Sequence, residues 1–328
     1  MFPGRLSSMP SPTNVILSSS ASVVTLQNEE ERVSCEDPQT SSVYALPLQM
    51  ALARQKQSAS INWLILGFMV LFHAGALAAL FLFSWSALIV SVILYVLAIN
   101  VGIGMGYHRL LTHRGYEVPR WLKRLMAVCA TLSLEGGPLV WVATHRIHHQ
   151  HTDKPGDPHS PHEGGWWSHA GWVIHGSGAH AEPVLLKKYV PDLMKDPFLL
   201  WLDRYHWLPL VVLACALLAV GGWPWVMWGI FLRVTIGLHA TWLVNSATHM
   251  WGSRRFATKD ESRNNWWVAI LTGGEGWHNN HHAHPASARH GMTWYELDVN
   301  YFGIWLLGKM GLAKHINAVS AAKLSGGA

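Results

Sequence analysis

Long stretches without charged residues constrain this chain more than any other feature. Residues 57 to 108 contain no Asp, Glu, Lys or Arg, and residues 205 to 253 contain only Arg233. A helix needs about 20 apolar residues to cross a hydrocarbon core of ~30 Å, so each stretch is long enough for two crossings. Ser84 divides the first stretch, and the run Gly221-Gly222-Trp223-Pro224 divides the second. Buried helices of a soluble protein would rarely leave paired uncharged stretches of this length.

We therefore expect an all-α membrane protein with four transmembrane helices arranged as two hairpins. The expected spans are residues 61–83, 85–107, 206–222 and 224–244. Residues 108–205 and 245–320 would then form a helical cap, with one helix over residues 119–142, and would complete a single domain over residues 46–320. Residues 1–45 are rich in Ser, Pro and Thr, which predicts a disordered tail.

The distribution of Lys and Arg predicts the orientation of these helices. The two short hairpin joins carry none, whereas residues 1–60 carry four, residues 107–206 carry eleven and residues 244–328 carry eight. Basic residues concentrate on the cytoplasmic side of membrane proteins. Both termini and the cap are therefore expected to be cytoplasmic. This orientation accounts for most of the net charge of +5, and no basic run with interleaved aromatics indicates a nucleic-acid partner.

Histidine is the second unusual feature. The chain has 21 His but only 19 Asp and Glu, and charged residues make up 13% of it, against ~25% in soluble domains. Two clusters share the spacing i, i+3, i+4, which places three imidazoles within about 100° on one helix face. Three such rings suit a metal, and they suit a plain core poorly because each ring needs a hydrogen-bond partner. The clusters are His145, His148 and His149, and His278, His281 and His282.

Two further elements add ligands. His108 and His113 are five residues apart, about 140° on an ideal helix, so both face one metal only if the helix ends or distorts between them. Asn245 and His249 are four apart and share a face at the end of the last span. Nine imidazoles are too many for one metal and suit two, although imidazole alone does not distinguish iron, zinc, copper and nickel. Three Cys are too few for a Cys-rich module.

Seven short segments occur in a characteristic order. They are GYHRLLTHR at 106–114, THRIHH at 144–149, DPHS at 157–160, WWSHAGW at 166–172, WLVNSATH at 242–249, GEGWHNNHH at 274–282 and SARHG at 287–291. In these motifs the chain resembles the membrane-bound fatty acyl desaturases, in particular the Δ9, stearoyl-CoA desaturase-like branch of bacterial type. The resemblance covers about residues 60–315. Front-end desaturases have Gln where this chain has His278, which disfavours that branch.

The resemblance implies a nonhaem di-iron centre under the cytoplasmic cap. One iron would bind His108, His113, His145, His149 and His281. The other would bind His148, His249, His278 and His282, with Asn245 holding a bound water. No His-Pro-Gly-Gly haem motif occurs, so electrons would come from a separate donor such as ferredoxin or a cytochrome b5-like reductase system.

The resemblance also implies the reaction. Two hydrogens would leave adjacent methylenes near C9 and C10 of a saturated acyl chain, which is carried as acyl-CoA or on a membrane lipid. The reaction would use O2 and two electrons, form a cis double bond, and take place at a bacterial inner membrane. An unactivated C–H bond has no acidic proton, so no catalytic residue beyond the metal ligands is expected.

Two alternatives remain open from the residues. A membrane di-iron hydroxylase of alkanes or lipids shares the type of scaffold, but it uses different histidine spacings. A metal transporter would place its ligands near the bilayer midplane, where only His73 and His239 lie; these two more plausibly form hydrogen bonds within the helix core.

Several residues are weaker candidates. Trp141 and Trp242 are candidates for the substrate tunnel because they lie close to the clusters in the sequence. The resemblance implies that Val96 and Asn100 limit the length of the acyl chain. Simple packing within the membrane explains these residues equally well. Basic residues could bind a headgroup phosphate or simply be solvated: Arg120, Lys123, Arg124, Arg254, Arg255 and Arg289. Asp153, Asp157 and His169 could orient metal ligands, and Arg233 needs a partner within its span.

Overall fold

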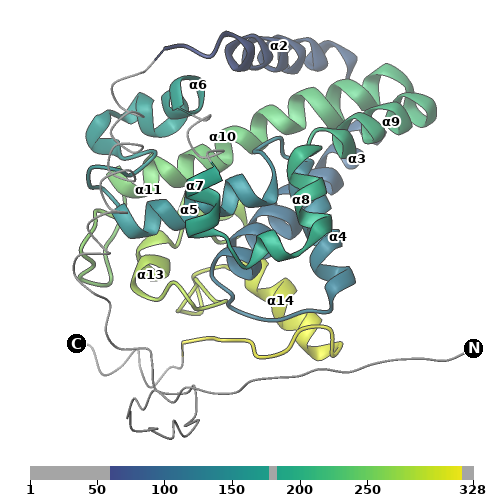
Figure 1. Cartoon of the computed structure of the whole chain (residues 1–328). Helices are drawn as coiled ribbons and strands as arrows, with labels where there is room; N and C mark the ends of the chain where they lie inside the picture. Colours follow the sequence, from purple (N-terminus) through teal and green to yellow (C-terminus); the bar gives the residue numbers. More distant parts are fainter. Residues whose placement is uncertain (1–59, 177–182, 320–328) are drawn as a thin grey trace, which may run out of the picture. The chain divides into compact units, whose positions relative to one another are not determined.

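The computed structural model describes residues 60–176 and 183–319 (Figure 1). In this part of the chain the regular elements are helices, with three isolated bridges and no strand. The all-α expectation is therefore confirmed for the described residues. The expected disordered tail, residues 1–45, lies outside them.

The first two expected spans begin with α2 and α3. The helix α2 (Trp63–Ala79) begins at Asn62, whose side chain accepts a hydrogen bond from the backbone of Ile65, and it ends in the short turn η1 (Leu80–Leu82). The hydroxyl of Ser84 then accepts from the backbone of Ala87 at 3.1 Å and begins α3 (Trp85–Tyr95). Serine and asparagine are preferred at this position because they satisfy free N–H groups of the first turn. The expected division at Ser84 is confirmed.

The second hairpin turns at Gly222. One continuous apolar stretch contains α9 (Leu208–Val226), η7 (Met227–Leu232), α10 (Arg233–Asn245) and α11 (Ala247–Met250). Gly222 interrupts it with φ 65° and ψ −163°, which no helical residue adopts. The side chain of Leu217 lies 2.8 Å from where a Cβ on Gly229 would be. In a straight helix these residues would be ~18 Å apart, so the chain folds back on itself (Figure 1).

Within residues 60–176 and 183–319, three helical stretches are long and apolar enough to cross a membrane: Trp63–Leu82, Trp85–Thr112 and Leu208–Met250. The third has 43 residues, which would be about 65 Å if straight, twice the thickness of a hydrocarbon core. The expected spans 206–222 and 224–244 are thus two arms of one stretch. Large apolar side chains on these helices face outward, including Phe81 (88% exposed) and Val220 (75% exposed), as contact with lipid requires.

The segments that we expected to form a cap contain more breaks than the sequence predicted. The expectation of one helix over residues 119–142 is wrong, because α4 (Arg120–Thr131) and α5 (Pro138–His151) are separate. Leu134 and Gly136 between them have positive φ angles of 62° and 107°. Pro138 is the first residue of α5, where its missing N–H costs nothing.

The remaining elements are short and surround the clusters. They are η3 (Pro161–Glu163), η4 (Trp167–Gly171), α6 (Trp172–Gly176), α7 (Pro183–Tyr189), η6 (Leu193–Lys195), α8 (Pro197–Arg204), α12 (Trp266–Thr272), α13 (His278–Ala283) and α14 (Val299–Lys309). One hydrophobic core joins α4, α5 and α8 through residues such as Met126, Ile147 and Leu199, and it also contains Ile103. A Cβ on Gly102 would lie 2.4 Å from the backbone nitrogen of Ala130, so this glycine permits the close packing of α4.

Candidate metal centre

A π-helix brings the first two histidines together. After α3 the chain continues as η2 (Val96–Thr112), and the backbone N–H of His113 donates to the carbonyl of His108 at 3.1 Å. This bond spans five residues, which is the π-helical pattern. The two ring centres therefore lie 4.9 Å apart. The helix is therefore distorted between His108 and His113, as their spacing of five residues required.

The nine histidines assemble into two groups. In each group, one nitrogen per ring lies within 4.8 Å of the corresponding nitrogens of all the others. The first group contains His108, His113, His145, His149 and His281, and the second contains His148, His249, His278 and His282. These are the two sets that the resemblance implied. Within the first group, Nε2 of His281 lies 3.1 Å from that of His108 and 2.9 Å from that of His149.

The chemistry of these rings fits metal binding. Nε2 of His113, His148 and His249 is buried without a hydrogen-bond partner among the described residues. An unpartnered buried nitrogen is costly in a folded protein unless something accepts its lone pair. Two convergent groups of such nitrogens therefore match the donor set of two transition-metal ions.

Electrostatics keeps most of these rings neutral, as metal ligation demands. Burial, and then repulsion between neighbouring rings, lowers the pKa of six of them well below the usual value: His113, His145, His149, His278, His281 and His282. His148 differs. Burial also opposes its charged form, but the carboxylate of Asp157 outweighs burial and raises the pKa of His148.

Carboxylates contact Nδ1 of four of these histidines, which leaves Nε2 free to bind a metal. The pairs are His108 with Glu275, His148 with Asp157 at 3.0 Å, His249 with Asp153 at 3.1 Å, and His282 with Asp260 at 3.0 Å. The expectation for Asp153 and Asp157 is confirmed. The sequence interpretation missed Glu275 and Asp260. There was a reason in the sequence to consider Glu275, because it stands three residues before a histidine cluster in a chain with few acids. Asp260 lies in a loop, where no sequence pattern marks it.

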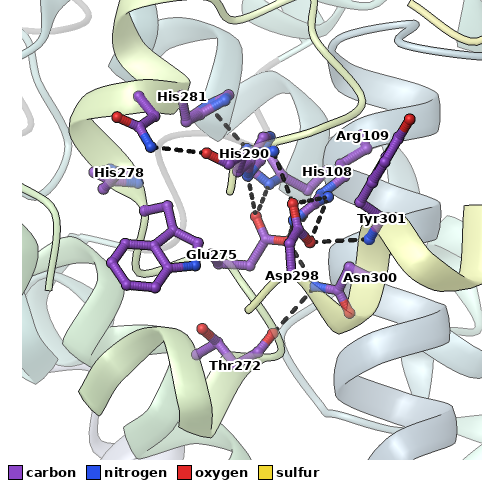
Figure 2. A network of polar contacts seen from close by, with 12 residues as sticks. His108, Arg109, Thr272, Glu275, His278, His281, His290, Asp298, Asn300 and Tyr301 are labelled. Atoms are coloured by element: carbon purple, nitrogen blue, oxygen red, sulfur yellow. Dashed lines mark hydrogen bonds and ion pairs between the residues drawn. The ribbon is translucent and has the colours of Figure 1, made fainter. Parts of the chain in front are cut away.

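Figure 2 shows how Glu275 is itself held. Arg109 is fully buried and donates to Glu275 at 2.8 and 3.1 Å and to Asp298 at 3.0 Å. Burial alone would raise the pKa of Glu275, but the charge of Arg109 lowers it well below the usual value. His290 lies 3.3 Å from Glu275 through Nδ1. The network thus fixes an ionised carboxylate behind His108.

Two cavities adjoin the histidines. The larger, about 120 Å³, is lined by Trp141, Trp242, His145 and Asn245 among others. The smaller, about 40 Å³, is lined by residues that include Trp141, Asn245, His108 and His278. Asn245 therefore borders both cavities beside members of both histidine groups. Both tryptophans that we singled out from the sequence line the larger cavity.

Glu135 is a second residue that sequence interpretation missed. It is half-buried and lines the larger cavity, where it accepts hydrogen bonds from Trp141 Nε1 at 3.0 Å and from the Thr241 hydroxyl at 2.9 Å. Burial raises its pKa to about 7. The sequence could have indicated Glu135, because it is a lone acid in the apolar run before Pro138.

Val96 and Asn100 lie elsewhere. Val96 is 43% exposed, and Asn100 is buried, where its amide donates to Asn300 at 2.9 Å and to the carbonyl of Thr272. Neither is among the residues that line the two cavities. The polar Asn100 therefore has its hydrogen-bond partners within the fold.

Most of the candidate headgroup residues have protein partners. The pairs are Arg124 with Asp196 at 2.8 Å, Arg254 with Glu261 at 3.6 Å, Arg255 with Glu296 at 2.8 Å, and Arg289 above the ring of Tyr301 at 5.7 Å. Arg120 is exposed and Lys123 is half-buried.

The remaining polar groups of the spans are also paired. His73 and His239 form a hydrogen bond of 3.0 Å, which confirms that they are bonded to each other within the spans, where both are partly buried. Arg233 donates to the carbonyls of Gly229 and Leu132. His169 contacts His239 and Ser246, neither of which belongs to the two histidine groups. The expectation that it orients a metal ligand is therefore wrong.

Comparison with known proteins agrees with this site. The fatty acid desaturase family model matches residues 83–301. An sn-2 palmitoyl-lipid 9-desaturase of Nostoc sp. (strain 36) is 47% identical over 79% of this chain and 91% of its own length. An sn-1 stearoyl-lipid 9-desaturase of Anabaena variabilis is 45% identical over 78% and 94%, and one of Synechocystis sp. is 44% identical over 77% and 80%. The chain belongs to the fatty acid desaturase family.

Proposed function

We propose that this protein is an O2-dependent desaturase that inserts a cis double bond at the Δ9 position of a saturated acyl chain carried on a membrane lipid. The two groups of buried, convergent histidines carry the proposal. The names of the relatives support the position and the lipid-bound substrate, since three of them at 44–47% identity are acyl-lipid 9-desaturases.

The proposed cofactor is a pair of iron ions, one in each histidine group, with Asn245 holding a water. When bound, the iron pair would supply the activation of O2 that an unactivated C–H bond requires. The chain's own residues hold and orient the ligands, exclude water, and position the substrate. Trp141 and Trp242 are proposed to contact the acyl chain, because they line the cavity next to His145. The electrons come from a separate donor protein.

The proposed membrane arrangement has four crossings. The stretches Trp63–Leu82 and Trp85–Thr112 provide two, and the two arms of Leu208–Met250 on either side of Gly222 provide the others. The distribution of Lys and Arg supports a cytoplasmic position for the metal centre and both termini, in a bacterial inner membrane. Exposed Arg120 lies in this cap, where it is available to a phosphate headgroup.

The test is an assay of purified protein, with iron and an electron donor, on phospholipid-bound stearate and on stearoyl-CoA, followed by gas chromatography. We expect Δ9 alkene on the phospholipid. Alkene on stearoyl-CoA alone would contradict the lipid substrate, and hydroxylated chains without alkene would identify a hydroxylase instead.

Two variants test the metal assignment. His148→Ala and His282→Ala each remove one ring of the second group, and both are expected to abolish alkene formation while membrane insertion remains intact. His162→Ala, at an exposed position outside both groups, is the control. Full activity in the first two variants would contradict the two-metal site.

A further inference from the structure

The face of α14 that points away from the protein is apolar. It carries five large side chains that are 42–61% exposed: Val299, Phe302, Trp305 and Leu306 of the helix, and Met310, which caps its end. At 100° per residue they fall within about 140° of the helix circumference, together with the single charged side chain of this arc, Lys309. A helix face in contact with water is normally polar. This stripe, the α14 face, therefore indicates a partner that is itself apolar.

The opposite side of α14 is fixed to the support of the first histidine group. The amide of Asn300 donates to Glu275 at 2.7 Å. Asp298, whose side chain caps the start of the helix, pairs with Arg109 at 2.9 Å. Figure 2 shows that these contacts belong to the network behind His108. The helix therefore cannot turn its apolar face inward without breaking that network.

The contact between α14 and the second span places this helix at the membrane surface. If the stretch Trp85–Thr112 enters the hydrocarbon at its first residue, 20 residues at 1.5 Å cover the ~30 Å core, which then ends near Gly104. A Cβ on Gly104 would meet the side chain of Asn300, and one on Gly303 would lie 2.9 Å from the sulfur of Met105. The helix α14 (yellow in Figure 1) thus packs against the span where the span leaves the hydrocarbon.

Lipid does not reach this end of the span directly. Val96 and Leu97, at 43% and 37%, are the last exposed side chains before residues 98–104, which are buried except for half-buried Val101. By the same arithmetic these seven residues, about 10 Å of helix, still lie within the hydrocarbon. Because other helices cover them, the outward faces of those helices meet the lipid instead.

The end of α12 belongs to the same cover. The hydroxyl of Tyr95 in α3 donates to the carbonyl of Leu271 at 2.8 Å, and the amide of Asn300 in α14 donates to the carbonyl of Thr272 at 3.1 Å. Ile270 and Leu271 are 61% and 41% exposed. Exposed apolar side chains therefore continue from α3 through the end of α12 to α14.

We propose that α14 and the end of α12 lie in the interface of the bilayer, with the α14 face in contact with lipid. The boundary between headgroups and acyl chains suits this face, because it combines apolar side chains with an indole ring and a lysine. The ammonium of Lys309 lies 5.5 Å over the ring of Trp305, and from there it can reach a lipid phosphate. The contact rests on the proposed membrane arrangement, and it holds the support of His108 at a fixed depth relative to the bilayer.

Spin labels test this contact in the full chain, loaded with diamagnetic zinc and placed in phosphatidylcholine nanodiscs after the native cysteines are replaced by Ala. A label on Leu306→Cys is compared with one on Val92→Cys, which α3 exposes, and with one on Lys259→Cys in an exposed loop. Oxygen concentrates in lipid, whereas a nickel chelate stays in water. We expect the ratio of oxygen to nickel relaxation at Leu306 to exceed that at Lys259 severalfold and to approach that at Val92.

A ratio at Leu306 equal to that at Lys259 would overturn the proposal. Protection from both reagents would also overturn it, because a second copy or another segment of the chain would then cover the face. Phe302→Cys, one turn earlier on the same face, repeats the measurement if the first label prevents folding. A water-like ratio at Val92 would instead contradict the proposed membrane arrangement, so the two failures are distinguishable.

A charge substitution gives an independent test. Leu306→Glu places a carboxylate against lipid, whereas Val184→Glu makes a similar change at a 66% exposed residue of α7, where exposed Lys187 and Lys188 follow three and four residues later. In the same nanodiscs we expect the unfolding temperature to fall by roughly 5 °C for Leu306→Glu and to stay unchanged for Val184→Glu. Equal unfolding temperatures of the two variants would overturn the proposal.

Discussion

Replacing Glu135 by Gln is expected to stabilise the protein in a pH-dependent manner. Burial raises the pKa of Glu135 from 4.5 to about 7, although hydrogen bonds from Trp141 and Thr241 act in the opposite direction. Because the folded pKa lies above the unfolded one, ionisation favours the unfolded chain. Stability is therefore complete below about pH 4.5, falls as the pH rises toward 7, and is constant above it. At 1.36 kcal/mol per unit, the full loss is about 3 kcal/mol.

Gln is a close mimic of the protonated acid. Its carbonyl oxygen can accept from Trp141 Nε1, and its amide can donate to the hydroxyl of Thr241. Between pH 5 and pH 8 the variant should therefore gain about 2–3 kcal/mol over the wild type, or roughly 5–10 °C in unfolding temperature.

The assay is thermal unfolding of the protein in lipid nanodiscs at both pH values. Glu117→Gln changes an exposed glutamate and is the matched control, for which no difference between the two pH values is expected. A Glu135→Gln variant whose advantage does not grow with pH would refute the reasoning. In that case the folded protein would stabilise the ionised form of Glu135, and a nearby positive charge would offset the effect of burial on its pKa.

Three further predictions concern the supports of the metal centre. Asp157→Asn should leave the chain folded but lower the affinity for zinc or iron, measured by titration, by about 10–100-fold, because His148 loses an orienting carboxylate. Arg109→Met should cost about 3–5 kcal/mol and abolish the monodisperse peak in gel filtration, since two buried carboxylates lose their partner; normal yield would contradict this. Gly102→Ala should lower the unfolding temperature because its Cβ would meet the backbone of α4, whereas Gly67→Ala, with nothing within 4 Å, should not.

Local patterns predicted much of the fold. The division at Ser84 was predictable because serine often begins a helix. The break at Gly222 was predictable because glycine readily adopts conformations that a helix excludes. The expected helix over residues 119–142 failed for a related reason. Its apolar residues continue across Gly136-Gly137-Pro138, but these helix-breaking residues lie between two separate helices.

The candidate ligands were predictable for a similar reason. Spacings of three and four residues set which side chains share a helix face, so His145, His148 and His149 could be grouped without coordinates. The spacing of His108 and His113 predicted only that the helix must be distorted. The structure supplies the distortion as the π-helix η2, which packs closely against α4 at Gly102.

The sequence by itself determined which parts of this chain are apolar enough to enter a membrane and which histidines can act together, because both properties depend on neighbours within a few residues. Only the tertiary structure decided which carboxylate stands behind each ring, that Glu135 borders the cavity, and that His73, His239 and His169 join into one chain. Most of these contacts link residues far apart in the chain: 167 positions for His108 with Glu275, 166 for His73 with His239 and 70 for His169 with His239. His148 and Asp157 are only 9 positions apart. The folding of the whole chain, and not a local pattern, brings such residues within hydrogen-bonding distance.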